Sequence, residues 1–104
     1  LGDATMLNTL LDRSHRPYLR PPFNVLAETP HNNAVNFLTG AGGFLQQVIY
    51  GWTGLRLSEN GLTQKFKPLL PEHVSKLILK NFMVQGNRLD IIVEKNAVKF
   101  VERL

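Results

Sequence analysis

The last third of the chain, residues 74–104, reads VSKLILKNFMVQGNRLDIIVEKNAVKFVERL. Residues 74–84 form a long run rich in aliphatic residues, residues 85–88 (QGNR) have turn composition, and residues 89–93 form a second apolar run. Another turn at residues 95–96 leads into a third run, which ends the chain. Short apolar runs joined by tight turns are typical of β-hairpins, so we expect an antiparallel sheet here.

Two further strands precede this sheet. Apolar and polar residues alternate over residues 55–58 and over residues 62–67, on either side of a turn at residues 59–61. Pro68 and Pro71 then interrupt the strand pattern. Five such strands need a partner layer to bury the second face of their sheet, and the sequence offers no obvious segment for it.

Helical patterns lie in the first half of the chain. Residues 3–16 predict a helix that Asp3 caps and Pro17 ends, with apolar residues at helical spacing. A second apolar helix is expected around residues 44–52, ended by Gly51 in a left-handed turn. The glycines expected to precede it are Gly40, Gly42 and Gly43. The character of the chain thus changes near residue 53, which predicts an α+β fold.

Length, composition and charge exclude several classes of protein. The chain has 104 residues, of which 43% are apolar and 19% charged, which suits one modest globular core. No apolar run approaches the roughly 18 residues of a membrane-spanning helix. Because the net charge of +4 is spread along the chain without a basic stripe, we expect no nucleic-acid and no membrane partner. The absence of cysteine suits any redox compartment and weakly favours the cytoplasm.

The segment from residue 18 to residue 40 shows no periodicity and is rich in Pro, Asn, Thr and His. Loops longer than about 12 residues inside compact domains are usually functional or disordered, and the apolar residues of this one argue against disorder. We therefore expect an ordered functional loop, kept extended in its first part by Pro21 and Pro22. Because the chain opens on Leu1, we also expect it to be a piece of a longer protein.

This loop contains Glu28, the only carboxylate between Asp12 and Glu59. A lone glutamate in a polar loop can be a solvated surface charge or a catalytic acid or base. Inverting glycoside hydrolysis needs two carboxyl groups about 6.5–9.5 Å apart, and this segment offers one. Spacing alone leaves both interpretations open.

Other candidate sites favour structural interpretations. His31 could act as a base or a ligand, but no second ligand lies at metal spacing, so we expect no metal and no cofactor. The glycine-rich stretch at residues 40–43 lacks the Lys-Ser/Thr pair of a phosphate-binding loop, which favours close packing. We expect the aromatic residues Phe44, Tyr50 and Trp52 to lie in the core rather than to form a sugar platform.

Three blocks of the chain resemble the C-terminal end of glycoside hydrolase family 65. They are residues 22–28 (PFNVLAE), 34–46 (AVNFLTGAGGFLQ) and 51–56 (GWTGLR), and residues 85–90 (QGNRLD) resemble a turn in the terminal sheet domain of that family. The resemblance runs from about Leu11 to the last strand. It is closest to the acid-trehalase-like branch, and within it to glucosidases acting on glucosyl-galactosyl-hydroxylysine.

The resemblance implies a fold and a reaction. Residues 1–53 would be the last helices of an (α/α)6 barrel and residues 54–104 a jelly-roll-like antiparallel β C-terminal domain. The family cleaves α-glucosidic bonds with inversion, and the position of its general base corresponds to Glu28, with the general acid upstream of these residues. The implied substrates are glucosyl-galactosyl-hydroxylysine of collagen first and trehalose second. We expect His31, Asn32 and Thr39 to bind substrate.

The same resemblance favours water over phosphate as the acceptor. Phosphorylases of the family resemble Ile-His-Ala-Ala-Ser-Leu-Gly-Gly where this chain has residues 36–43, which places Phe37 at the phosphate-binding histidine. A phenyl ring cannot donate a hydrogen bond to phosphate, so we expect a hydrolase. Leu26 stands where some relatives have an aromatic residue, two positions before the catalytic Glu. The alternative is a non-catalytic β-domain that binds carbohydrate or buttresses a barrel.

Overall fold

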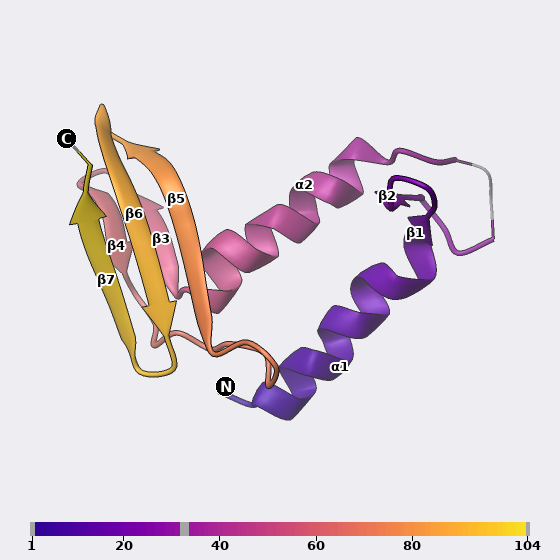
Figure 1. The fold of residues 1–104 in the computed structure, drawn as a ribbon, viewed down its shortest axis with the longest axis horizontal. Helices are drawn as coiled ribbons and strands as arrows, with labels where there is room; N and C mark the ends of the chain where they lie inside the picture. Colours follow the sequence, from indigo (N-terminus) through magenta and orange to yellow (C-terminus); the bar gives the residue numbers. More distant parts are fainter. Residues whose placement is uncertain (1, 32–33, 104) are drawn as a thin grey trace.

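The computed structural model describes residues 2–31 and 34–103. Helices occupy one side of the molecule, and most strands occupy the other (Figure 1). The helical elements are α1 (Ala4–His15), the 3-10 turn η1 (Arg16–Tyr18), α2 (Leu38–Gln46) and the π-helical segment η2 (Gln47–Trp52). The strands are β1 (Leu19–Arg20), β2 (Val25–Leu26), β3 (Leu55–Ser58), β4 (Gly61–Gln64), β5 (Lys76–Val84), β6 (Asn87–Glu94) and β7 (Ala97–Glu102). The predicted α+β class is confirmed.

Helix α1 begins and ends close to the predicted residues. The Asp3 carboxylate accepts a hydrogen bond from the Met6 N–H at 2.9 Å, which satisfies one of the free donors of the first turn. The first turns are also tied to the segment between β4 and β5, because Thr5 Oγ1 donates to Glu72 Oε1 at 3.0 Å and the Glu72 N–H donates to Asn8 Oδ1 at 3.0 Å.

No helix in residues 2–31 and 34–103 is long and apolar enough to cross a membrane.

The second helix starts earlier than the sequence suggested. Gly40, Gly42 and Gly43 lie inside α2 and do not precede it, so this expectation was wrong. The space at Gly40 explains one of them, since a Cβ there would come within 2.7 Å of the Phe37 ring. The predicted close packing is therefore found at Gly40. At Gly42 and Gly43, by contrast, no atom would lie within 4 Å of an added Cβ.

The chain leaves the helix at Gly54 and not at Gly51, which corrects a second expectation. Gly51 lies within η2, and the left-handed residue is Gly54, with φ +77°. A Cβ at Gly54 would lie 2.1 Å from the Phe66 carbonyl oxygen, so the space admits only glycine. The buried Thr53 hydroxyl donates to the Ile49 carbonyl and accepts from the Leu55 N–H, which completes the hydrogen bonds at this corner.

The long segment between the helices is more regular than predicted. Strands β1 and β2 form a short antiparallel hairpin in which Leu19 pairs with Leu26 and Arg20 with Val25. Pro21 and Pro22 occupy its turn and are joined by a cis peptide bond, so the expected extended stretch is a turn instead.

The five strands of the second half form two sheets rather than one. Strands β3 and β4 pair as a hairpin, and β5, β6 and β7 form an antiparallel sheet in that order. The tight turn between β5 and β6 consists of Gln85 and Gly86, both with positive φ, as hairpin loops of two residues require. The predicted strands are present with shifted ends, since β4 stops at Gln64 and not at residue 67, and since Asn87 and Arg88 belong to β6 and not to the turn. Their division into two sheets was not foreseen.

The core lies between these two sheets and the end of η2. Ile91 and Val93 on β6 are fully buried, and they cluster with Trp52, Leu55 and Leu70. The β3–β4 hairpin and the end of the helix thus supply the partner layer that the sequence seemed to lack. Trp52 is buried as expected, and its indole N–H is the one buried side-chain polar group without a partner among the described residues.

A β-bulge interrupts the pairing of β5 with β6 between Leu79 and Phe82. Asn81 has φ +57° there, and its N–H donates to Asp90 Oδ1 at 3.0 Å. The Arg103 Nε also donates to the Asp90 carboxylate, at 2.9 Å. The Asn81 N–H, followed by Arg103, lowers the pKa of Asp90 below its ordinary value, although partial desolvation opposes the shift. The carboxylate thus stabilises the bulge in its ionised form.

Candidate functional site

Glu28 lies two residues after the end of β2, and the backbone around it is held from two sides. The Ala27 N–H donates to the Tyr18 carbonyl at 2.8 Å, and the Phe37 N–H donates to the Leu26 carbonyl at 2.7 Å. The side chain of Ala27 is almost completely buried. The chain on both sides of the 28–34 loop is therefore anchored, and Glu28 is presented from an ordered base.

Glu28 itself closes the loop. Its N–H donates to the Ala34 carbonyl at 2.9 Å, which holds the backbone at Glu28 next to that at Ala34. Its side chain is exposed and makes no hydrogen bond or ion pair with another described residue. A carboxylate in this position is free to accept a hydrogen bond from water or from a sugar hydroxyl.

Arg20 holds the residues that directly follow Glu28. Its guanidinium group donates to the Thr29 carbonyl at 3.2 Å and to the Pro30 carbonyl. It also donates to the carbonyls of Pro17 and Leu19, both at 3.1 Å. A guanidinium has five N–H donors in a rigid plane and can therefore bridge several carbonyls that a lysine could not. Arg20 fixes the backbone immediately after Glu28, and sequence reasoning did not single it out.

The other predicted site residues are only partly brought together. His31 is exposed in the loop that Glu28 closes, and Thr39 is exposed in the first turn of α2. No side-chain hydrogen bond joins either of them to Glu28 among the described residues. Asn32 lies outside the described residues. The described ranges contain no group of three or more His, Asp or Glu side chains that could hold a metal ion.

Several apolar side chains in the segments on either side of Glu28 are exposed. Phe23, in the β1–β2 turn, is 86% exposed, and Leu38, at the start of α2, is 72% exposed. Val35 and Phe37, from the segment between β2 and α2, are also exposed. Where exposed apolar side chains gather, they mark surfaces that contact another part of a protein or a ligand.

The geometry is that of an exposed carboxylate on an anchored backbone, with exposed apolar side chains in the neighbouring segments. A family model described as "Glycosyl hydrolase family 65, C-terminal domain" matches residues 55–102. The chain is also 39% identical over 100 residues to the protein-glucosylgalactosylhydroxylysine glucosidase of Danio rerio, a match that covers 95% of this chain. The chain belongs to glycosyl hydrolase family 65. The family resemblance seen in the sequence is thereby confirmed.

Further family members extend the comparison. The protein-glucosylgalactosylhydroxylysine glucosidase of Mus musculus is 42% identical over 94% of this chain, and the periplasmic/secreted acid trehalase of Candida glabrata is 34% identical over 92% of it. The chain spans only 15%, 14% and 9% of the lengths of these three relatives, in the order given. No solved structure gives a match.

Proposed function

We propose that this chain is part of an inverting α-glucoside hydrolase in which Glu28 is the general base. The observation that carries the proposal is the similarity, over nearly the whole chain, to proteins named as glucosidases and an acid trehalase. The hydrogen bonds that anchor the backbone on both sides of Glu28 support it, since a catalytic group acts from a positioned attachment.

In the proposed reaction, the Glu28 carboxylate removes a proton from a water molecule as the water oxygen attacks the anomeric carbon. The glycosidic bond breaks at the same time, and a carboxylic acid from outside these residues protonates the leaving oxygen. Attack from the face opposite the leaving group inverts the anomeric configuration, so an α-glucoside releases β-glucose. The Phe37 phenyl ring at the position of a phosphate-binding histidine supports water as the acceptor.

The helical half supports a place at the end of a larger helical domain. Neither α1 nor α2 has a buried residue among those described. Each helix carries exposed apolar side chains, which are Met6 and Leu10 on α1 and Leu38 and Leu45 on α2. We infer that residues 1–53 complete an (α/α)6 barrel, whose remaining helices cover these faces, and that residues 54–104 form its jelly-roll-like C-terminal domain.

The favoured substrate is glucosyl-galactosyl-hydroxylysine, and trehalose is the second candidate, following the names of the relatives. His31, Asn32 and Thr39 are proposed to contact the sugar around Glu28. On this proposal the 104-residue chain alone is inactive, because the second carboxyl group of the pair lies outside it.

Replacing Glu28 tests the proposal in the full-length protein. We expect Glu28→Gln to reduce kcat for glucosyl-galactosyl-hydroxylysine by about 10³-fold or more, because the amide cannot take the proton from water. Glu59→Gln is the matched control, since Glu59 is an exposed glutamate in the β3–β4 turn. Near-normal hydrolysis by Glu28→Gln would contradict the catalytic role and leave the non-catalytic β-domain as the better interpretation.

A second variant separates a base from a structural residue. Azide needs no deprotonation, so it can replace water in Glu28→Ala and attack the anomeric carbon directly. The expected product is the β-glucosyl azide, detected by NMR or mass spectrometry, with turnover restored by azide. If Glu28 only supported the loop, azide would restore nothing.

A further inference from the structure

The inner face of the β5–β6–β7 sheet carries buried apolar side chains in one part and exposed polar and aromatic side chains in another. Antiparallel register places Ile91 beside Phe100 and Leu89 beside Glu102 on neighbouring strands. Because side chains alternate between faces, residues 87, 89, 91 and 93 of β6 share the face that carries the core. Toward the β5–β6 turn this face leaves the buried core and presents an asparagine, Asn87, and a half-exposed aromatic ring, that of Phe100.

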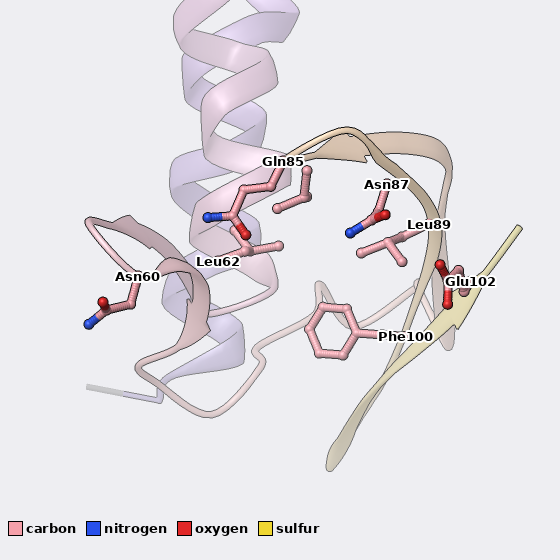
Figure 2. A pocket seen from close by; sticks show the side chains of 8 residues that line it. Asn60, Leu62, Gln85, Asn87, Leu89, Phe100 and Glu102 are labelled. Carbon is pink, nitrogen blue, oxygen red and sulfur yellow. The ribbon is translucent and has the colours of Figure 1, made fainter.

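A pocket of about 330 Å³ lies at this end, between the two sheets. Its lining residues are Asn60, Leu62, Val84, Gln85, Asn87, Leu89, Phe100 and Glu102. Figure 2 shows Asn87, Leu89 and Phe100 directed from one sheet toward Leu62 of the other, while Asn60 lies at the margin. The pocket is distinct from the Glu28 loop, because none of its lining residues comes from the segment between α1 and α2.

Gln85 bridges the two sheets and forms one wall of the pocket. Its side-chain amide reaches from the β5–β6 turn to Gly61, where a Cβ would lie 3.1 Å from the amide oxygen. Gly61 has φ +105° and begins β4, so its missing side chain makes room for the amide. The side-chain amides of Gln85 and Asn87 make no hydrogen bond to any other residue in the described ranges.

The chemistry of the lining selects one class of ligand. A side-chain amide has both donors and an acceptor, which matches a hydroxyl group that also donates and accepts. The Phe100 ring, 46% exposed, offers a flat apolar surface for the C–H face of a ring. No lysine or arginine lines the pocket, and its single ionisable group is the Glu102 carboxylate, which disfavours anions.

We propose that this pocket is a second carbohydrate site, which binds one neutral pyranose unit. A volume of about 330 Å³ is at the small end of ligand pockets and suits a single sugar ring rather than a long oligosaccharide. Asn87 and Gln85 bind hydroxyl groups, and the Phe100 ring packs against the sugar ring. In a glycoside hydrolase, such a site would hold a glycan between the two sheets without taking part in cleavage.

The site can be tested by titrating the ¹⁵N-labelled 104-residue chain with methyl α-D-glucopyranoside and following its amide signals. For a ligand of this size we expect a dissociation constant of the order of 1–10 mM, with saturable shifts at residues 85–89 and 100–102. Sorbitol is the control ligand, since it has similar hydroxyl groups but no ring face. Saturable binding of the glucoside and not of sorbitol is the expected result.

Paired variants locate the site. Asn87→Ala and Phe100→Leu are each expected to weaken binding by up to about tenfold. Their controls are Asn96→Ala, in the turn at the opposite end of β6, and Phe66→Leu, an exposed residue between β4 and β5 that does not line the pocket. The proposal is overturned if no saturable shift occurs by about 100 mM glucoside, or if a control variant weakens binding as much as its partner. Glu28→Gln leaves this titration unchanged, so the two proposals fail separately.

Discussion

The strand half and the helical half of the chain bury their apolar residues to very different degrees. Ile91 and Val93 on β6 are 0% exposed, whereas Met6 and Leu10 on α1 are 53% and 52% exposed. The two sheets share this core with Trp52 at the end of η2, whereas α1 contributes only the partly buried Leu7 and Leu11 to it and α2 has no buried residue. The strands therefore bury their central apolar side chains within this chain. The helices α1 and α2 instead leave apolar side chains exposed to solvent.

The largest expected effect contrasts one core position with one exposed helix position. Ile91→Ala should lower the free energy of unfolding by about 2–5 kcal/mol, because it leaves a cavity between the sheets. Leu10→Ala should change it by less than about 0.5 kcal/mol, since that side chain is half exposed and alanine favours the helix. Urea unfolding of the 104-residue chain measures both values. Equal losses in the two variants would show that the helices are as well packed as the strands.

The second prediction concerns the joint between the halves. Gly54→Ala should lower the free energy of unfolding by about 1–3 kcal/mol, because it adds backbone strain at φ +77° and a clash with the Phe66 carbonyl. The matched control is Gly86→Ala, at φ +79° with no atom within 4 Å of its Cβ, which should cost only the strain, about 1 kcal/mol. If Gly86→Ala lowered the free energy of unfolding as much as Gly54→Ala, the clash with the Phe66 carbonyl would contribute nothing to the effect.

The smallest effect is a change in acid stability within the strand half. The lowered pKa of Asp90 means that its carboxylate stabilises the fold above about pH 4, and this contribution is lost as the pH falls through the folded pKa. Asp90→Asn should therefore reduce the difference in stability between neutral and acidic pH. Arg103→Gln should reduce it less, because the Asn81 N–H, the larger cause, remains. Identical pH profiles for wild type and Asp90→Asn would contradict this account.

Local signals in the sequence predicted most of the elements. Asp3 marked the start of α1, and the Gln85-Gly86 turn set the pairing of β5 with β6. Glu28 was singled out, but the structure leaves its catalytic role and the domain boundary at residue 53 as predictions. These successes depend on interactions between residues close in sequence, such as a cap or a two-residue turn.

Long-range features could not be predicted in the same way. The division of five strands into two sheets depends on how β3 and β4 pack across the core, which alternation within a strand does not encode. The helix end was assigned to Gly51 because the clash that requires glycine at Gly54 involves Phe66, twelve positions further along the chain. The sequence does not distinguish Arg20 from the other charged residues, because the carbonyls of Thr29 and Pro30 reach it only in the folded chain.

The buried indole of Trp52 has a practical consequence. It is the only tryptophan in the chain, and it lies where the end of η2 meets both sheets. Because its N–H has no hydrogen-bond partner among the described residues and its surroundings are apolar, its fluorescence should be blue-shifted in the native state and move to the red on exposure to water. The molecule therefore carries a built-in optical reporter of the contact between its two halves, which needs no added label.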